Sequence, residues 1–198
     1  MPRHPYMNTT DKIRRVVEIR VITGKARGIQ LKTPDGVHTR PTTDRVKEAI
    51  FSIIHFDIPN AIVLDLFGGT GQLGIEALSR GAKSAVFVDE RDDSCKLIRE
   101  NIKRTGFDKQ SSVVRSDYSV YLKKCSQKFD LILLDPPYAE VFLENSLKMI
   151  SEIDILQSGG IIVTERPLGK DLPWEHPCYL RSKDYKYGNT LITIFRKK

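Results

Sequence analysis

The sequence has few of the features that mark membrane or secreted proteins. No apolar run in its 198 residues approaches the roughly 20 residues that a membrane span requires. The polar N-terminal stretch lacks the apolar segment of a secretory signal. The three cysteines, Cys95, Cys125 and Cys178, are odd in number and widely spaced, which excludes a disulfide framework. We therefore expect a cytoplasmic protein with no membrane partner and no metal site.

Serine- and glycine-rich linkers, low-complexity stretches and long repeats are also absent. With 40% apolar and 29% charged residues, the chain is typical of a soluble globular protein of one domain. We expect a monomer with three parts. These are a flexible extension over 1–18, a small hairpin over 19–39 and the main domain over 40–198.

Positive charge is concentrated at the N-terminus. The formal net charge is +7, and residues 1–32 contribute eight basic and two acidic residues to it. A basic segment attached to a nearly neutral remainder indicates a polyanionic partner such as nucleic acid. A solvated terminal arm without a partner is the alternative.

Short β-branched runs alternate with helical stretches from residue 61 onward. The expected strands are 62–67, 85–88, 112–115, 131–134 and 161–164, and the expected helices are 73–80, 92–105, 118–124 and 141–153. This alternation predicts an α/β fold, with a mostly parallel sheet and helices on both faces. The last two runs, 179–186 and 190–196, have no helix between them and predict a C-terminal antiparallel hairpin.

Two further elements are expected before this alternation. A β-branched run over 16–23, a glycine-bounded turn over 24–28 and a short apolar run over 29–31 predict the small basic hairpin. After Pro41, apolar residues recur at helical spacing and predict a helix capped by Thr43 or Asp44.

A glycine-rich loop follows the first strand of the main domain and contains Phe67, Gly68, Gly69 and Gly71. Glycines between a strand and a helix let the backbone turn tightly and approach a ligand. In an open parallel sheet, ligands bind beyond the carboxyl ends of the strands. The spacing of Gly69, Gly71 and Gly74 also fits a dinucleotide fingerprint, so a nicotinamide-dependent oxidoreductase is a competing interpretation.

Three aspartates stand at the ends of successive strands. Asp65 suits an ammonium group and would repel a pyrophosphate. Asp89 is placed to accept hydrogen bonds from ribose hydroxyls, and Asp117 is placed to accept them from an adenine amine. Around a glycine loop, these carboxylates indicate a pocket for a cationic nucleoside that carries an amino acid, which is S-adenosylmethionine. Ordinary loop carboxylates are the alternative interpretation.

The expected strand 131–134 is followed by Asp135, Pro136, Pro137 and Tyr138. The prolines hold the backbone extended and leave their carbonyls free as acceptors. An acid and an aromatic beside such a stiff turn suit a planar substrate amine. Asp135 and the Pro136 carbonyl would accept its hydrogens, and Tyr138 would stack on its ring. The amine lone pair would then point at the donor methyl, so we predict these four as the catalytic residues. A turn that only closes the strand is the alternative.

The glycine loop together with Asp135–Tyr138 resembles the amino-methyltransferases of the Rossmann-like superfamily. Four further segments, 20–28, 40–48, 73–81 and 187–190, are similar to those of the bacterial 16S ribosomal RNA guanine-N2 methyltransferase family. The resemblance runs from about residue 19 to the C-terminus. It implies methyl transfer from S-adenosylmethionine to the exocyclic N2 amine of one guanine in 16S ribosomal RNA or in the small-subunit particle.

The resemblance also implies a set of binding residues. Those for the cofactor are Asp65, Phe67, Gly68, Gly69, Gly71, Asp89, Asp117, Tyr118, Thr42 and Arg45. Gly69 stands where the family usually has Ala, and Asp89 replaces the more usual Glu, one methylene longer. These departures loosen the loop and shorten the reach to the ribose without removing a ligand.

Lys25, Arg27 and Arg40 are the residues that we expect to bind RNA phosphates, a contact that depends on salt but not on base sequence. Two other functions remain open. Adenine-N6 methyltransferases acting on RNA or DNA share the same tetrapeptide, although they generally add a recognition domain. A non-catalytic RNA-binding module is less consistent with the sequence, because both the acid and the aromatic of the tetrapeptide are present.

Overall fold

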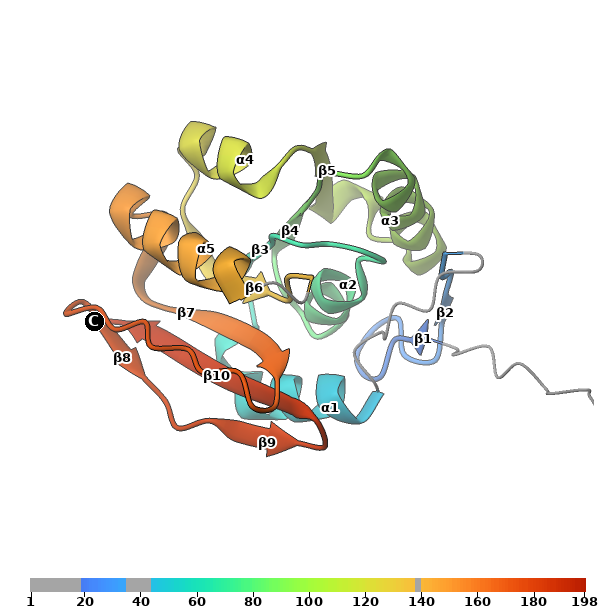
Figure 1. The fold of residues 1–198 in the computed structure, drawn as a ribbon. Helices are drawn as coiled ribbons and strands as arrows, with labels where there is room; N and C mark the ends of the chain where they lie inside the picture. The colour runs from blue at the N-terminus through green and yellow to red at the C-terminus, as the bar shows by residue number, and fades with distance from the viewer. Residues whose placement is uncertain (1–18, 35–43, 138–139) are drawn as a thin grey trace, which may run out of the picture.

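The structure, a computed structural model, describes residues 19–34, 44–137 and 140–198. A central sheet of eight strands runs through the molecule (Figure 1). Its parallel part consists of β5 (Ser111–Arg115), β4 (Ser84–Asp89), β3 (Ile62–Asp65), β6 (Phe129–Leu134) and β7 (Leu156–Pro167), in that spatial order. The antiparallel part adds β10 (Thr190–Lys197) beside β7, followed by β8 (Tyr179–Arg181), while β9 (Tyr185–Tyr187) also pairs with β10.

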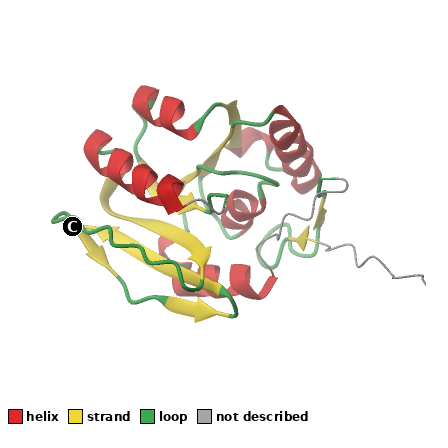
Figure 2. Cartoon of the chain, in the orientation of Figure 1, coloured by secondary structure: helices red, strands yellow, loops and turns green. Residues whose placement is uncertain are grey.

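Helices cover both faces of this sheet (Figure 2). One face carries α1 (Asp44–Ile53), α2 (Gln72–Ser79) and α3 (Asp92–Thr105), and the other carries α4 (Tyr118–Lys124) and α5 (Glu140–Ile153). Two short 3-10 helices, η1 (His55–Asp57) and η2 (Asp108–Gln110), complete the helical elements of the described residues. In β6, Leu131 and Leu133 pack on the first face, and Ile132 and Leu134 pack on the second. The inner strands β3, β4 and β6 are largely apolar because both faces of the sheet are covered there.

These features confirm the predicted Rossmann-like α/β fold, including the bounds of α3 and α4. One detail of the C-terminal prediction is wrong, because the strand expected over 179–186 is broken into β8 and β9. The Ser182 hydroxyl instead accepts from the Ile194 amide, and Asp184 accepts from the Arg166 guanidinium and from the Thr193 hydroxyl. The side chains between β8 and β9 thus bind to their neighbours where continuous strand pairing was expected.

The N-terminal hairpin consists of β1 (Ile19–Arg20) and β2 (Gln30–Leu31). Its turn is held against the C-terminal end of α2, because the Lys25 amide donates to the Ser79 carbonyl at 2.8 Å. A Cβ atom at Gly24, where φ is +88°, would lie 1.8 Å from that same carbonyl oxygen, so only glycine fits there. The buried Glu76 carboxylate accepts from the Ile22 and Thr23 amides. Residues 19–34 are therefore packed on the sheet domain.

A buried lysine ties α1 to this hairpin. The Lys47 side chain is 0% exposed, and its Nζ donates to the Arg20 carbonyl at 2.6 Å. The Asp44 carboxylate lies 3.6 Å from the same nitrogen. Burial lowers the pKa of Lys47, and the nearby carboxylates of Glu76 and Asp44 oppose that shift.

Within the described ranges, no helix is long and apolar enough to cross a membrane. Those ranges also contain no group of three or more His, Cys, Asp or Glu side chains arranged to hold a metal ion.

Candidate active site

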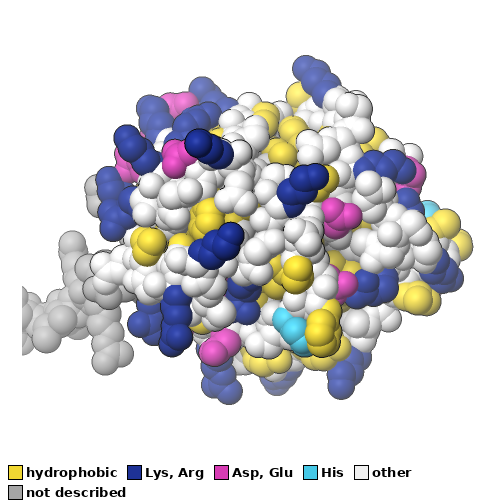
Figure 3. Space-filling view, turned by 180° about the vertical axis from the view of Figure 1, so that it is seen from behind, with side chains coloured by type: hydrophobic (Ala, Val, Ile, Leu, Met, Phe, Trp, Pro, Cys, Tyr) yellow, Lys and Arg dark blue, Asp and Glu magenta, His cyan; other side chains and the backbone are white. Residues whose placement is uncertain are grey.

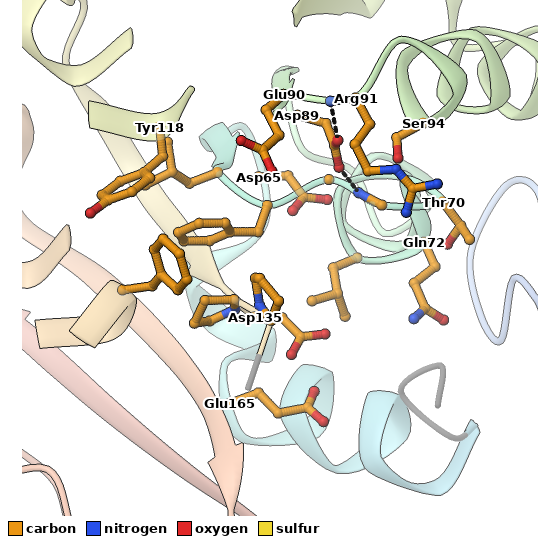
Figure 4. A pocket seen from close by; sticks show the side chains of 18 of the residues that line it. Asp65, Thr70, Gln72, Asp89, Glu90, Arg91, Ser94, Tyr118, Asp135 and Glu165 are labelled. Carbon is orange, nitrogen blue, oxygen red and sulfur yellow. Dashed lines mark hydrogen bonds between the residues drawn. The ribbon is translucent and has the colours of Figure 1, made fainter. Parts of the chain in front are cut away.

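A cavity of about 500 Å³ opens at the carboxyl ends of the parallel strands (Figure 4). Its walls extend from Pro34, next to the N-terminal hairpin, to Thr190, at the start of β10. A volume of this size is typical of small-molecule sites, and the carboxyl edge of a parallel sheet is where such sites form.

The glycine loop forms one wall by folding around the end of β4. The Gly68 amide donates to the Val88 carbonyl at 2.8 Å, and the Gly69 amide donates to the Asp89 carboxylate at 2.9 Å. Gly71, with a φ of +78°, is the residue before α2, so the loop delivers the chain directly into the helix N-terminus. Gly69 is exposed and lines the cavity, and because it has no Cβ atom a ligand can approach its backbone closely.

Asp89 is held in a fixed position at the end of β4. One carboxylate oxygen accepts from the Gly69 amide, and the other accepts from the Arg91 amide at 2.9 Å. Each carboxylate oxygen has a second lone pair, so Asp89 retains acceptor capacity for hydroxyl groups of a ligand.

Asp117 serves as the N-cap of α4. One of its oxygens accepts from the Ser119 amide, the Ser119 hydroxyl and the Val120 amide. The hydrogen bond from the Ser119 hydroxyl is the main reason that the pKa of Asp117 is lowered. Asp117 lines the cavity while performing this capping role, a use of the side chain that the sequence interpretation did not foresee.

Asp65 and Gln72 are buried polar groups at the base of the cavity. Asp65 is 2% exposed and accepts from the Gly74 amide at 3.0 Å. Burial raises its pKa to about 7, and the negative charges of Asp135 and Asp89 add to the shift. The Gln72 side-chain oxygen is buried and has no hydrogen-bond partner among the described residues. Both groups line the cavity, and a cationic donor such as an ammonium would satisfy both.

Aromatic rings form a second wall. The Phe67 and Tyr118 ring centroids lie 5.4 Å apart, and the Tyr118 and Phe142 rings meet edge to face at 5.7 Å. All three residues line the cavity. This wall suits the flat face of a heterocycle.

The structure brings most of the predicted site residues together. Asp65, Phe67, Gly68, Gly69, Asp89, Asp117, Tyr118, Asp135, Pro136 and Pro137 all line the cavity. Gly71 precedes α2 just behind this lining, and Arg45 is exposed in the first turn of α1. Thr42, Arg40 and Tyr138 lie outside the described residues.

Lys25 and Arg27 lie at a distance from the cavity. Both are exposed in the hairpin turn that contacts Ser79, the last residue of α2, whereas the cavity meets α2 at its first residue, Gln72. Eight helical residues separate these ends by about 12 Å.

Several lining residues were not among the predicted ones. They are Gln72 and Ser94 on the glycine-loop side, Glu90 and Arg91 after β4, and Glu165, Arg166, Asn189 and Thr190 where β7 meets β10. Glu165 follows the predicted strand 161–164 directly. In the structure β7 continues to Pro167, so Glu165 is not at a strand end, and its place beside Asp135 follows from the pairing of β6 with β7.

Comparisons with known proteins agree with this geometry. Residues 19–196 match the family described as "Conserved hypothetical protein 95". The chain is 38% identical to the YlbH protein of Bacillus subtilis (strain 168) over 91% of this chain and 100% of that protein. It is 34% identical to "Ribosomal RNA small subunit methyltransferase D" of Escherichia coli (strain K12), over 91% of each.

A solved structure gives the same result for the fold. The yhhF protein of Escherichia coli superposes with a TM-score of 0.82 at 29% sequence identity, covering 91% of this chain and 98% of that one. The family resemblance seen in the sequence is thus confirmed over nearly the whole length. The chain belongs to the family described as "Conserved hypothetical protein 95" and is similar to proteins named as small-subunit ribosomal RNA methyltransferases.

Proposed function

We propose that this protein transfers a methyl group from S-adenosylmethionine to the exocyclic N2 amine of a guanine in the 16S ribosomal RNA of the small ribosomal subunit. One observation carries the proposal. Asp135, Pro136 and Pro137 line the same cavity as the glycine loop and its flanking carboxylates. A methyl donor and an acceptor amine can therefore meet within it. The name of the Escherichia coli relative supports small-subunit ribosomal RNA as the substrate.

The residues of the cavity fit S-adenosylmethionine, which supplies an electrophilic methyl group when bound. Asp65 and the Gln72 side-chain oxygen would accept from the ammonium of its methionine part. Asp89, held by two backbone amides, would accept from the ribose hydroxyls. Phe67 and Tyr118 would contact the adenine face, and the second carboxylate oxygen of Asp117, which caps no helix amide among the described residues, would accept from the adenine amine.

Three further residues belong to this proposed cofactor site on family resemblance. Gly71 would support the loop from behind, and Thr42 and Arg45 would approach the methionine end from the segment that leads into α1. A pyrophosphate fits the cavity poorly, because Asp65 and Asp89 would both repel it. This argues against a nicotinamide dinucleotide as the ligand.

Methyl transfer would depend chiefly on how the acceptor amine is held. The Asp135 carboxylate and the Pro136 carbonyl would accept its two hydrogens, which turns the nitrogen lone pair toward the donor methyl. As the nitrogen–carbon bond forms, the sulfur–carbon bond breaks, and the sulfur keeps that electron pair. The methylated nitrogen then carries the positive charge and loses one proton to Asp135 or to water. No strong base is required, since the proton becomes acidic only after transfer. Tyr138 would stack on the base.

RNA binding would use Lys25, Arg27 and Arg40. Lys25 and Arg27 lie about 12 Å along α2 from the cavity, so they would contact phosphates of nucleotides near the target. Cationic side chains are spread over the face of the molecule that Figure 3 shows. Long-range attraction of RNA is therefore not limited to the hairpin, although the hairpin would fix its position.

The test is methylation of small ribosomal subunits purified from cells that lack this gene. Labelled S-adenosylmethionine, nuclease digestion and nucleoside analysis would identify the product, and we expect N2-methylguanosine. Asp135→Ala should lower turnover by at least about 100-fold and leave cofactor affinity nearly unchanged. N6-methyladenosine as product would favour the adenine-specific alternative. Near-normal turnover of Asp135→Ala would remove the tetrapeptide from the mechanism.

A further inference from the structure

We infer that Glu165 determines the choice of guanine as the target base, an inference that rests on the proposed function. Glu165 lies on β7 next to Asp135. Strands β6 and β7 are parallel and pair Leu134 with Thr164, so the residues that follow, Asp135 and Glu165, are neighbours at the same level. Asp135 comes directly after β6, whereas Glu165 is still part of β7 and pairs with Ile192 of β10. Both line the cavity. Figure 4 shows their carboxylates extending into the same part of it, away from Asp89 and Glu90.

Purines differ at the ring atom next to the exocyclic amine. In guanine the N2 amine adjoins N1–H, a donor, whereas in adenine the N6 amine adjoins N1, an acceptor. The N2 amine of guanine lies between N1–H and N3. In this proposal Asp135 and the Pro136 carbonyl would hold the amine with N1 turned toward the residue beside Asp135. A carboxylate is an acceptor only, so Glu165 would bind guanine N1–H and repel the lone pair of adenine N1. The two adjacent acids thus match the two adjacent donors of guanine.

The backbone at Glu165 is held firmly enough for such a role. The next residue, Arg166, is buried, and its guanidinium donates to the Thr193 hydroxyl at 2.5 Å and to Asp184 at 2.5 Å. Its Nε donates to the Lys170 carbonyl at 3.0 Å. These bonds fix the end of β7 to β10 and to the loop before β9. Discrimination between bases requires a group that does not move to accommodate the wrong one.

The experiment compares two substrates that differ only at the target. Once the methylated position is mapped, small subunits are prepared with guanosine or adenosine there, from cells that lack this gene. We expect wild-type kcat/KM to favour guanosine by at least about 100-fold. Glu165→Gln, whose amide can also donate to adenine N1, should lower kcat/KM for guanosine by about 10- to 100-fold. It should reduce the guanosine-to-adenosine ratio by at least about tenfold. Glu165→Asp, which keeps the charge, should retain most of the preference.

The controls separate base selection from general damage. Glu152→Gln changes an exposed acid of α5 in the same way and should leave both rates unaltered. Calorimetric titration with S-adenosylmethionine checks that each variant keeps its cofactor site. If Glu165→Gln binds S-adenosylmethionine poorly, Glu165→Ala is used in its place. Equal loss of both activities, with the ratio unchanged, would overturn the inference while leaving the proposed function standing. Absence of N2-methylguanosine from the wild-type reaction would overturn the proposed function itself.

Discussion

The side chain of Asn101 joins the glycine loop to the N-terminal hairpin. Its Nδ2 donates to the Thr70 carbonyl at 2.9 Å and to the Lys32 carbonyl at 3.0 Å, and its Oδ1 accepts from the Lys32 amide at 2.7 Å. Asn101 is fully buried in α3, and Thr70 lines the cavity. One amide group therefore fixes the glycine loop relative to the hairpin segment proposed to bind RNA.

Replacing Asn101 with Asp should destabilise both the glycine loop and the N-terminal hairpin. The carboxylate keeps the shape but cannot donate, so it would face two backbone carbonyls in a buried position. We expect a loss of about 2 to 4 kcal/mol in the free energy of unfolding, measured by urea denaturation, together with weaker binding of S-adenosylmethionine. Asn145→Asp, an exposed change on α5, is the matched control. A stability equal to that of the control would show that the Asn101 bonds contribute little.

Cofactor affinity should depend on pH through Asp65. Its pKa is raised to about 7, whereas an ammonium ligand requires the ionised carboxylate. Below that value the ligand must displace a proton, so the dissociation constant should rise by about tenfold for each pH unit. Calorimetry between pH 5.5 and 7 measures this slope. Asp65→Asn should bind more weakly and lose the slope, and a slope that persists in that variant would assign it to another group.

The same carboxyl group should make the ligand-free protein less stable as the pH rises. The pKa of Asp65 is about 7 in the folded state, whereas the unfolded chain releases this proton near the ordinary aspartate pKa of 3.8. The folded state thus binds more protons between these values, and the free energy of unfolding contributed by Asp65 falls as the pH rises through them. Urea denaturation at pH 5 and 7 should show a smaller decrease for Asp65→Asn than for the wild type.

Gly74 should tolerate no side chain. A Cβ atom there would lie 2.3 Å from the ring of Phe87, which is fully buried on β4. We expect Gly74→Ala to cost about 1 to 3 kcal/mol by overpacking. Phe87→Leu in the same chain should relieve part of that cost, so the double variant should be more stable than the sum of the single effects predicts. If the changes in the free energy of unfolding were strictly additive, the effect of Gly74→Ala would not come from overpacking against Phe87.

The hairpin can be tested through salt dependence. Lys25→Ala with Arg27→Ala should weaken binding to ribosomal RNA and lower the slope of log affinity against log salt by about 1.4 to 1.8. Filter binding across a salt series gives this slope. Lys123→Ala with Lys124→Ala removes two exposed charges from the last turn of α4 and should have a smaller effect. Equal slopes for the two double variants would remove the hairpin from the interface.

Elements with local signals were predicted with the bounds that the structure has. Helix α3 ends before Gly106, which adopts a φ of +76°, and α4 begins after Asp117, whose side chain caps it. Both signals depend on neighbouring residues only, so the sequence contains them in full, although the capping role of Asp117 was not recognised from it. The carboxylates at the strand ends could also be found, because each directly follows a predicted strand and parallel strands bring their carboxyl ends to one edge.

Residues whose roles depend on distant partners could not be found in this way. Asn101 appears in the sequence as one polar residue of a helix, and its contacts with Lys32 and Thr70 arise only from tertiary packing. Gln72 is likewise an ordinary first helical residue until the cavity encloses it. Glu165 gains its place beside Asp135 from the pairing of β6 with β7, and the pairing order of strands is a property of the whole sheet.

The cavity walls span the sequence from Pro34 to Thr190. During synthesis, the growing chain can therefore form the glycine loop and most of the parallel sheet before the wall supplied by β10 exists. Ligand binding becomes possible in full only after nearly all of the protein has been made. A truncated chain that lacks β10 should therefore be unable to bind its ligands fully, even where its earlier segments fold.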